Sequence, residues 1–532
     1  MVECAARSHR SGRRLTNNGS SPRVTATNER KKEMKKKILS LLLIATMLLS
    51  VLAMASCGTT APPSSNDGNE TLAEGETADP NANLPNAAGL ASYDVPSVGY
   101  DGSAVTVVFY HSMGAKLQGV LNTYIEEFNK LYPNITIEHS SMGDYDGVRD
   151  QIKTQLTAGQ QPNIAYCYPD HVALYNMTKK VIPLDNFINS TIEVTDSEGN
   201  KTVLGLTAEQ KADFIEGYYK EGAAFDKRGT MYTLPMSKST EALYYNKTFF
   251  EEHDLKVPTT WEEMEQVCAD IKAIDPECTP LGYDSEANWF ITMCEQYGSP
   301  YTSLDETNHF QFDNETNRSF VKMFHDWYKK DYVTTEELNG SYTSGLFTAT
   351  EGRKCYMVIG STGGASYQTP PQVDGVSLFE TAMATPPQVN PDAPKVISQG
   401  PSLCLFESDN PQEVVASWLF MKFLTTDVAF QAEFSMASGY APVIKSVQEN
   451  AIYKEWLDSA NGFNNMTALS VKLALSQSNA YFVSPAFNGS SVARDQVGIL
   501  MQDALVCSEA DIDAAIAKLF KDAVGKCKFA IA

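Results

Sequence analysis

The sequence contains none of the short motifs that mark the common hydrolases, nucleotide-binding enzymes and metalloenzymes. It has no G-x-S-x-G nucleophile turn, no H-E-x-x-H pair and no Walker A loop, and only seven histidines. Its ten cysteines form no C-x-x-C pair and no Cys/His spacing typical of a metal site. We therefore expect a protein that is not an enzyme and that needs no metal and no cofactor.

Positive charge is also scarce. The chain has 42 Lys and Arg residues against 65 Asp and Glu, a formal net charge of −23. Residues 1–40 hold eleven of the basic residues and three of the acidic ones, so the rest of the chain carries −31. A surface this acidic repels the phosphates of nucleic acid and of anionic lipid, which argues against nucleic acid as a partner.

The cysteines are expected to serve packing. Eight of them lie beyond residue 103, several in apolar, strand-like runs such as KCYMVIG and SLCLF, where a free thiol behaves as a small hydrophobic group. We predict mostly buried thiols. One disulfide among Cys268, Cys278 and Cys294 would also fit the sequence, and spacing does not reveal its connectivity.

A long apolar run occurs near the N-terminus. Three lysines precede an uncharged segment from Ile38 to Ala53, and a cysteine, Cys57, follows Ala55-Ser56. This order is typical of a secretory signal peptide and resembles a bacterial lipoprotein signal, although Met54 stands where such signals usually have Leu. The resemblance implies an extracytoplasmic protein held to the cell membrane by a lipid on Cys57. The alternative, a transmembrane helix, is disfavoured because a polar linker follows.

The organisation follows from this signal. Residues 1–56 are a leader and signal peptide, with translation expected to start at Met34; an unusually long basic segment before the signal is the alternative. Residues 57–102 are rich in Gly, Pro, Ser, Thr, Asn and Asp, and we predict a disordered tether. The folded part from residue 103 is too long for one hydrophobic core and suggests two lobes.

Strands and helices alternate in the folded part. AVTVVFY at 104–110, ITIEHSS at 135–141 and NIAYCY at 163–168 read as strands. Residues 115–131 and 144–159 read as amphipathic helices between them, and Thr260 with Glu263 forms a capping box before a later helix. Repeated strand–helix–strand units predict an α/β fold with a parallel sheet.

Five segments of the folded part are distinctive in their sequence and order: the opening FYHSMGAKLQGVLNTYIEEFNKLYPNITIE, then PMSKSTEALYYNKTFFEEHDLKVPTTWEEM, FTATEGRKCYMVIGSTGGAS, QGPSLCLF, and KFLTTDVAFQAEFSMASGYAPVIKSV. Together they resemble the bacterial family 1 extracellular solute-binding proteins, the receptors of ABC importers. Within the family, the chain looks most like glycerol-3-phosphate-binding proteins and their carbohydrate-binding relatives.

The resemblance implies a two-lobed, periplasmic-binding-protein-like fold that closes on a ligand in an interlobe cleft. We expect lobe 1 to comprise residues 103–236 plus 356–400, and lobe 2 residues 237–355 plus 401–532. The expected function is capture of a carbohydrate for a membrane permease, by a protein that acts as a monomer. The alternative ligand is glycerol 3-phosphate or a glycerophosphodiester.

One departure from the family bears on the ligand. Where the glycerol-phosphate receptors carry an arginine in a Gly-rich stretch, this chain has Asn488 in AFNGSS. Arginine suits bidentate phosphate recognition. Its absence at this position favours a neutral sugar, unless Arg494 takes over the role.

The resemblance and the strand ends together indicate ligand-binding candidates. Trp289 could offer an apolar face to a sugar ring, although a Trp on an amphipathic helix is also a common core residue. Tyr145 and Asp146 begin a helix, where Asp146 could bind a hydroxyl or merely act as a capping acid. The other candidates follow strands or lie at the crossings between lobes, where core or turn roles are the alternatives: Tyr110, His111, Asp170, Ser237, Ser239, Gly360, Ser361 and Tyr440.

A secreted carbohydrate-active enzyme is the rival from another functional class. It would need two carboxylates on either side of a glycosidic bond, which spacing alone does not reveal in a chain this acidic. A purely structural surface lipoprotein is a third reading, and it would need no interlobe cleft. The absence of any catalytic motif favours the receptor over the enzyme.

Overall fold

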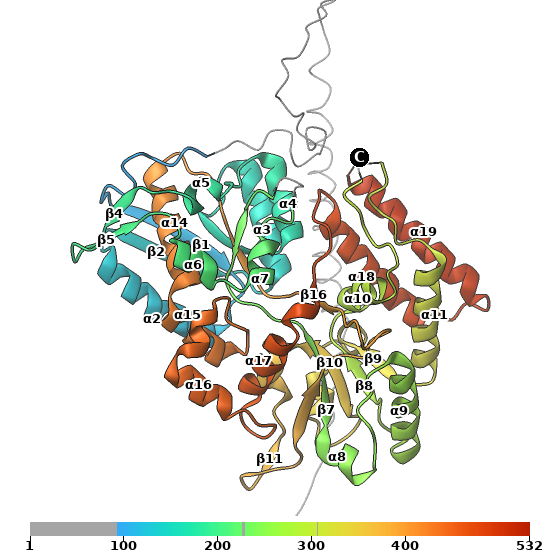
Figure 1. Cartoon of the computed structure of the whole chain (residues 1–532). Helices are drawn as coiled ribbons and strands as arrows, with labels where there is room; N and C mark the ends of the chain where they lie inside the picture. The colour runs from blue at the N-terminus through green and yellow to red at the C-terminus, as the bar shows by residue number, and fades with distance from the viewer. Residues whose placement is uncertain (1–92, 226–228, 306, 532) are drawn as a thin grey trace, which may run out of the picture. The chain divides into compact units, whose positions relative to one another are not determined.

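The computed structural model describes residues 93–225, 229–305 and 307–531, so the signal segment and Cys57 lie outside the described residues. These described residues belong to one compact unit. Within it, two five-stranded sheets each organise a hydrophobic core with helices on their faces (Figure 1). We call the parts built on these sheets the first and the second lobe.

The first lobe contains the predicted parallel sheet. Its strand order is β2-β1-β3-β15-β6, in which β1 pairs in parallel with β2 and β3, and β15 pairs antiparallel with β3 and β6. Helix α2 (Ala115–Leu131) spans the predicted residues and buries its apolar face, with Leu121 and Phe128 fully inaccessible. The strands are β1 (Val105–His111), β2 (Ile135–Ser141), β3 (Ile164–Cys167), β6 (Thr233–Pro235) and β15 (Ser402–Leu405).

The second lobe is built on the sheet β13-β7-β10-β8-β9. Helix α9 (Trp261–Ile274) begins at the predicted capping box, in which Thr260 and Glu263 each accept from the other's backbone N–H. The strands are β7 (Glu241–Asn246), β8 (Leu281–Tyr283), β9 (Val333–Thr335), β10 (Met357–Ser361) and β13 (Thr381–Ala384). The main covering helices are α10 (Glu286–Gln296), α11 (Glu315–Lys329), α18 (Ser490–Val506) and α19 (Ile512–Ala530).

The remaining elements are further α-helices and small two-stranded sheets. The helices are α3 (Tyr145–Ala158), α4 (Pro169–Tyr175), α5 (Asp185–Ile188), α6 (Ala208–Asp213), α7 (Glu216–Glu221), α8 (Lys247–Glu252), α12 (Glu336–Asn339), α13 (Ser344–Phe347), α14 (Pro411–Thr426), α15 (Val428–Ser438), α16 (Ala451–Asp458) and α17 (Met466–Ser476). The strands are β4 (Glu193–Thr195), β5 (Lys201–Val203), β11 (Gln372–Val373), β12 (Val376–Ser377), β14 (Val396–Ile397) and β16 (Tyr481–Phe482).

The strand pairing corrects the predicted lobe boundaries. Residues 356–400 were expected in lobe 1, but their strands β10 and β13 both pair with β7 of the second lobe. Residues 401–532 were expected in lobe 2, but β15 joins the first sheet, and α14 and α15, orange in Figure 1, contact β1 and α2. Near the end of this range, Phe487 and side chains of α18 and α19 belong to the second core. The sheet that a strand joins is decided by long-range pairing, which the local pattern does not encode.

The predicted tether ends earlier than residue 102. Residues 93–102 lie on the first lobe, where Tyr93 stacks on Phe187 with ring centroids 5.7 Å apart and Tyr100 meets Tyr132 edge-on at 6.0 Å. Gln412 donates to Gly99 O and accepts from Asp101 N. These few aromatic side chains bind the end of a polar segment to the lobe, which its average composition did not indicate.

The eight cysteines of the described part are free thiols, and all but Cys507 are buried, as the apolar runs predicted. Trp261, Trp327 and Trp418 are also core residues. No helix in the described part of the chain is both apolar and long enough to span a membrane.

Candidate functional site

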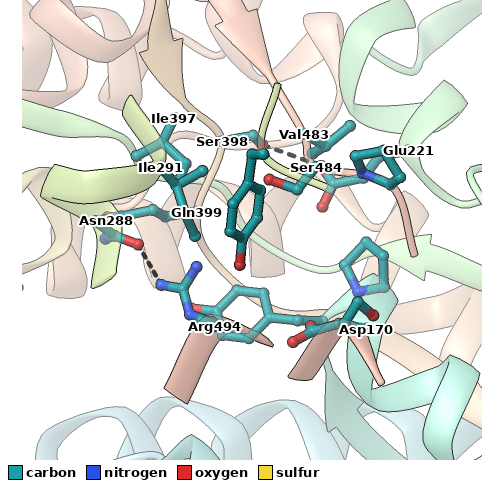
Figure 2. A pocket seen from close by; sticks show the side chains of 15 residues that line it. Asp170, Glu221, Asn288, Ile291, Ile397, Ser398, Gln399, Val483, Ser484 and Arg494 are labelled. Atoms are coloured by element: carbon teal, nitrogen blue, oxygen red, sulfur yellow. Dashed lines mark hydrogen bonds between the residues drawn. The ribbon is translucent and has the colours of Figure 1, made fainter. Parts of the chain in front are cut away.

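A pocket of about 110 Å³ lies where the two lobes meet (Figure 2). The first lobe contributes the turn after β3 and the end of α7, and the second contributes α10 and the N-terminal turns of α18. The end of β14 with the two residues after it, and the segment 483–485 after β16, add to the walls. Its lining comprises Tyr168, Pro169, Asp170, Glu221, Asn288, Ile291, Tyr301, Ile397, Ser398, Gln399, Val483, Ser484, Pro485, Ser490 and Arg494.

Arg494 brings a full positive charge to this pocket. It lies one turn into α18, and its guanidinium donates to Asn288 Oδ1 on α10, as Figure 2 shows. No carboxylate of the described residues lies within 4.0 Å of this guanidinium. A half-buried arginine held by a neutral amide retains donors for a ligand oxygen.

Behind Arg494 lies a buried acid. Glu241 Oε2 accepts a hydrogen bond from Tyr283 Oη at 2.7 Å. Burial raises the pKa of Glu241 to about 7, although hydrogen bonds from Tyr283 and Asn288 and the charge of Arg494 oppose this shift. Asn288 thus lies between this acid and the guanidinium that faces the pocket.

Tyrosine rings extend from the pocket across the first lobe. Tyr168, which lines the pocket, packs against Tyr145 with ring centroids 4.7 Å apart. The Tyr145 and Tyr440 hydroxyls are 3.5 Å apart. Gly363 lies under Tyr440, where an added Cβ would come within 2.7 Å of Tyr440 Cζ, so only glycine permits this close approach. These rings offer apolar faces with hydroxyls at their edges.

A buried ion pair lies under the pocket, where the chain crosses between the lobes. Lys238 Nζ, fully buried, is 2.9 Å from Glu221 Oε2 and donates to Ser402 Oγ at 3.3 Å. Ser398 Oγ donates to the same Glu221 oxygen at 3.0 Å, as the second dashed line in Figure 2 shows. We call the parts of the chain between β6 and β7 and between β13 and β15 the crossing segments, because the chain changes sheets there. Glu221, which lines the pocket, is thus held by Lys238 of one crossing segment and by Ser398 of the other.

Two predicted site residues line the pocket. Asp170 follows β3 as expected and lies in the first turn of α4, and Arg494 is present although Asn488 is not part of the lining. Tyr145 and Tyr440 belong to the neighbouring tyrosine group.

Trp289 requires a correction. Its side chain is 0% exposed in the second core, where it stacks on Tyr283 at 4.7 Å and contacts Phe324 at 4.1 Å. It therefore offers no face to a ligand in this structure. Its helix reaches the pocket through Asn288 and Ile291 instead.

The last two residues of β1 are engaged by other side chains of the protein. His111 is fully buried; its Nδ1 accepts from Met113 N, and its Nε2 lies 2.9 Å from His139 Nδ1. Tyr110 Oη accepts from Gln155 Nε2 at 3.1 Å and the ring packs against the first lobe. Neither residue lines the pocket.

Asp146 is not the cap of α3. The capping residue is Asp144, which accepts from Gly147 N, whereas Asp146 has an exposed carboxylate that pairs with Arg149 at 3.0 Å. The capping alternative was therefore assigned to the wrong acid of the Asp-Tyr-Asp sequence.

The remaining candidates lie at the crossings and fit the turn and core alternatives. Ser237 and Ser239 are buried, and Ser361 Oγ donates to Ser239 Oγ at 3.3 Å while accepting from Gly363 N. Gly360 lies in β10, where a Cβ would come within 2.8 Å of Asp284 Oδ2.

Sequence reasoning missed several residues of the lining. Tyr168 lies two residues before the candidate Asp170, and Asn288 directly precedes the candidate Trp289. The end of β3 and the start of α10 were therefore the signals that could have found them. Gln399 begins the QGPSLCLF segment and Ser490 lies in AFNGSS, so those two segments were also available signals. Glu221, Ser398 and Ser484 come from segments without a motif, and only the tertiary fold brings them to the pocket.

Comparison with known proteins identifies the family. The model of the bacterial extracellular solute-binding proteins matches residues 123–460. This chain belongs to that family. The family consists of solute-binding receptors, and the expected resemblance is confirmed.

Relatives with known names share the fold. The sn-glycerol-3-phosphate-binding periplasmic protein UgpB of Escherichia coli (strain K12) is 24% identical over 363 residues, which cover 65% of this chain and 76% of UgpB. UgpB of Mycobacterium tuberculosis, in complex with glycerophosphocholine, superposes with a TM-score of 0.63 at 15% identity, covering 81% and 99% of the two chains. Maltose-bound MalE3 of T. maritima gives 0.59 at 17% identity, covering 79% and 100%. The two-lobed α/β fold is thereby confirmed.

Proposed function

We propose that this protein is the substrate-binding receptor of an ABC importer and captures a carbohydrate in the interlobe pocket for delivery to a membrane permease. One observation carries the proposal: both lobes contribute hydrogen-bonding side chains to a single pocket. Ser398, Gln399, Ser484 and Ser490 are neutral donors and acceptors that suit sugar hydroxyls. A ligand held this way contacts both lobes, as a receptor that closes on its ligand requires.

Tyrosine replaces tryptophan as the proposed apolar surface. Tyr168 lines the pocket and Tyr145 lies behind it, so a sugar ring could pack its C–H face on Tyr168. Tyr301 borders the second-lobe side of the same pocket.

Arg494 favours a second candidate, a glycerol 3-phosphate or glycerophosphodiester ligand. Its guanidinium has no carboxylate partner among the described residues and faces the pocket next to neutral hydroxyls. Arginine recognises phosphate oxygens through parallel, charge-assisted hydrogen bonds. The names of the UgpB relatives agree with this alternative.

A titration with paired variants distinguishes the two ligands. The full chain is first screened by thermal shift against mono- and oligosaccharides and glycerol phosphates, and the best ligand is then titrated into Tyr168→Ala and Arg494→Gln. A sugar receptor loses ~1.5–3 kcal/mol of binding free energy in the tyrosine variant. A phosphate receptor loses ~1.5–3 kcal/mol in the arginine variant, and its affinity falls with added salt.

Arg353→Gln is the matched control, because Arg353 pairs with Asp331 on the second lobe outside the pocket. Equal effects of Arg353→Gln and Arg494→Gln would contradict the phosphate candidate. Recovery of every bound sugar unchanged after prolonged incubation is expected of a receptor, and cleaved products would contradict this function.

The proposal includes an N-terminal lipid anchor on Cys57, which lies outside the described residues. The basis is the order of lysines, apolar run and cysteine in the signal segment. Cys57→Ala is expected to release the protein from the membrane fraction. Mass spectrometry that found the mature N-terminus at another residue would contradict the anchor.

A further inference from the structure

Arg149 connects the two lobes at the edge of the pocket. It lies on α3, whose Val148 and Ile152 belong to the core of the first lobe. Its Nη1 donates to Ser491 Oγ at 3.2 Å and lies 3.4 Å from Asp495 Oδ1, both on α18 of the second lobe. The Arg149 side chain is only 12% exposed, so this contact is partly shielded from water and salt.

Arg149 also forms ion pairs within the first lobe. Besides Asp495, it pairs with Asp146 at 3.0 Å and with Asp150 at 2.9 Å on its own helix. Burial raises the pKa of Asp495 and the charge of Arg149 lowers it, so the arginine helps to keep this carboxylate ionised.

Asp495 is also the neighbour of Arg494 in the sequence. Arg494 turns toward Asn288 and the pocket, whereas the Asp495 carboxylate is engaged by Arg149. Arg149 of the first lobe thus pairs with Asp495, the acid that follows the pocket residue Arg494 in the sequence.

We propose that Arg149 is a positioning residue for solute binding, which ties α3 to α18 when the lobes are closed and keeps the Asp495 carboxylate occupied beside Arg494. This inference rests on the proposed receptor function. Because α3 and α18 belong to different cores, separation of the lobes would break the contacts with Ser491 and Asp495. Interactions made in one state only shift the population toward that state.

A double-mutant cycle without ligand tests the tie itself. Arg149→Gln, Asp495→Asn and the double variant of the full chain are compared by small-angle scattering and by hydrogen exchange of α3 and of the first turns of α18. Each single variant should be less compact and exchange faster in these helices, and the double variant should add little to either. High salt should weaken the difference between wild type and variants.

Two further variants separate this role from general stability. Ser491→Ala removes one interlobe acceptor with minimal change of shape and should shift exchange in the same direction. Arg318→Gln breaks a pair with Asp313 at 2.5 Å inside the second lobe and should alter neither compactness nor exchange at α3. Additive effects in the cycle, or equal effects of Arg318→Gln, would overturn the inference.

Binding provides a second readout, with sn-glycerol 3-phosphate and maltose as probes. For a probe that binds the wild type, Arg149→Gln should raise the dissociation constant about fivefold, mainly through faster dissociation. An unchanged dissociation rate would overturn the positioning role. If neither probe binds the wild type, these ligand classes fail, while the ligand-free cycle still decides whether Arg149 ties the lobes.

Discussion

Trp289 is held by aromatic neighbours on several sides and is predicted to act on stability. Tyr283 and Phe324 contact its ring, and Trp261 stacks at 6.5 Å. Trp289→Ala should lower the free energy of unfolding by ~3–5 kcal/mol, because it leaves a cavity that the core fills only in part. Denaturant unfolding measures this loss.

Trp289→Phe is the matched control, since it keeps an aromatic ring and should retain most of the stability and full binding of the screened ligand. Loss of binding in a well-folded Trp289→Phe protein would show that the residue contacts the solute after all.

His111 should make stability depend on pH. The pKa of His111 is lowered from 6.5 to about 4, mainly by burial and to a smaller extent by the charge of the neighbouring His139. In the unfolded chain the imidazole takes up its proton near pH 6.5, so its contribution is complete above that pH and is lost as pH falls toward 4. The loss should reach ~3 kcal/mol at most.

Urea unfolding at pH 7, 5.5 and 4 compares wild type with His111→Gln, which keeps a polar side chain that does not titrate. The variant should lose less stability between pH 7 and pH 4 than the wild type. Parallel curves for the two proteins would rule out this role of His111.

The site shows what residue patterns can predict. Asp170 was found because a polar residue directly after a parallel strand lies at the sheet edge where ligands bind. Trp289 was misplaced because a tryptophan on a helix is equally suited to a pocket and to a core, and only the packing of Tyr283 and Phe324 decides. Ser398 and Glu221 could not be predicted, since they meet through the crossing segments.

At the scale of elements, the two crossing segments pack tightly on each other. Gly400 has a φ of +90°, and an added Cβ would lie 2.5 Å from Ser237 O and 2.8 Å from Lys238 Cα. Gly400→Ala combines left-handed backbone strain with a clash against backbone atoms, so we expect a loss of ~2–4 kcal/mol. Thermal unfolding of the purified variant measures it.

Gly217→Ala is the control for Gly400→Ala. Gly217 lies in α7, has no heavy atom within 4 Å of an added Cβ, and should keep or gain up to ~1 kcal/mol of stability. A Gly400→Ala protein as stable as Gly217→Ala would show that the crossing segments can separate at little cost.

Elements were predicted far better than their pairing. The helix at 115–131 and the strand at 135–141 match the structure residue for residue, because their periodicity is strong and local. The lobes predicted for β10 and for β15 were wrong, because both lobes offer an apolar strand the same kind of local environment. Crossings between the lobes were predicted near residues 236, 356 and 401. The steps from β6 to β7 and from β13 to β15 do change sheets, but β9 and β10, on either side of residue 356, belong to the same sheet, so the crossing predicted there was wrong.

For the whole molecule, two cores with a shared pocket predict closure that depends on the solute. At 100 times its dissociation constant, a ligand that binds only the folded, closed protein should add ~2.7 kcal/mol to the free energy of unfolding. Scattering from the same samples should show compaction, with a non-binding sugar at equal concentration as the control. Without ligand, the Arg149→Gln variant should be more open than the wild type, because it lacks the interlobe contacts of Arg149. Its dimensions should therefore decrease more than those of the wild type when ligand saturates the pocket. A saturating ligand that stabilises the protein without compacting either chain would show that the pocket binds its solute without movement of the lobes.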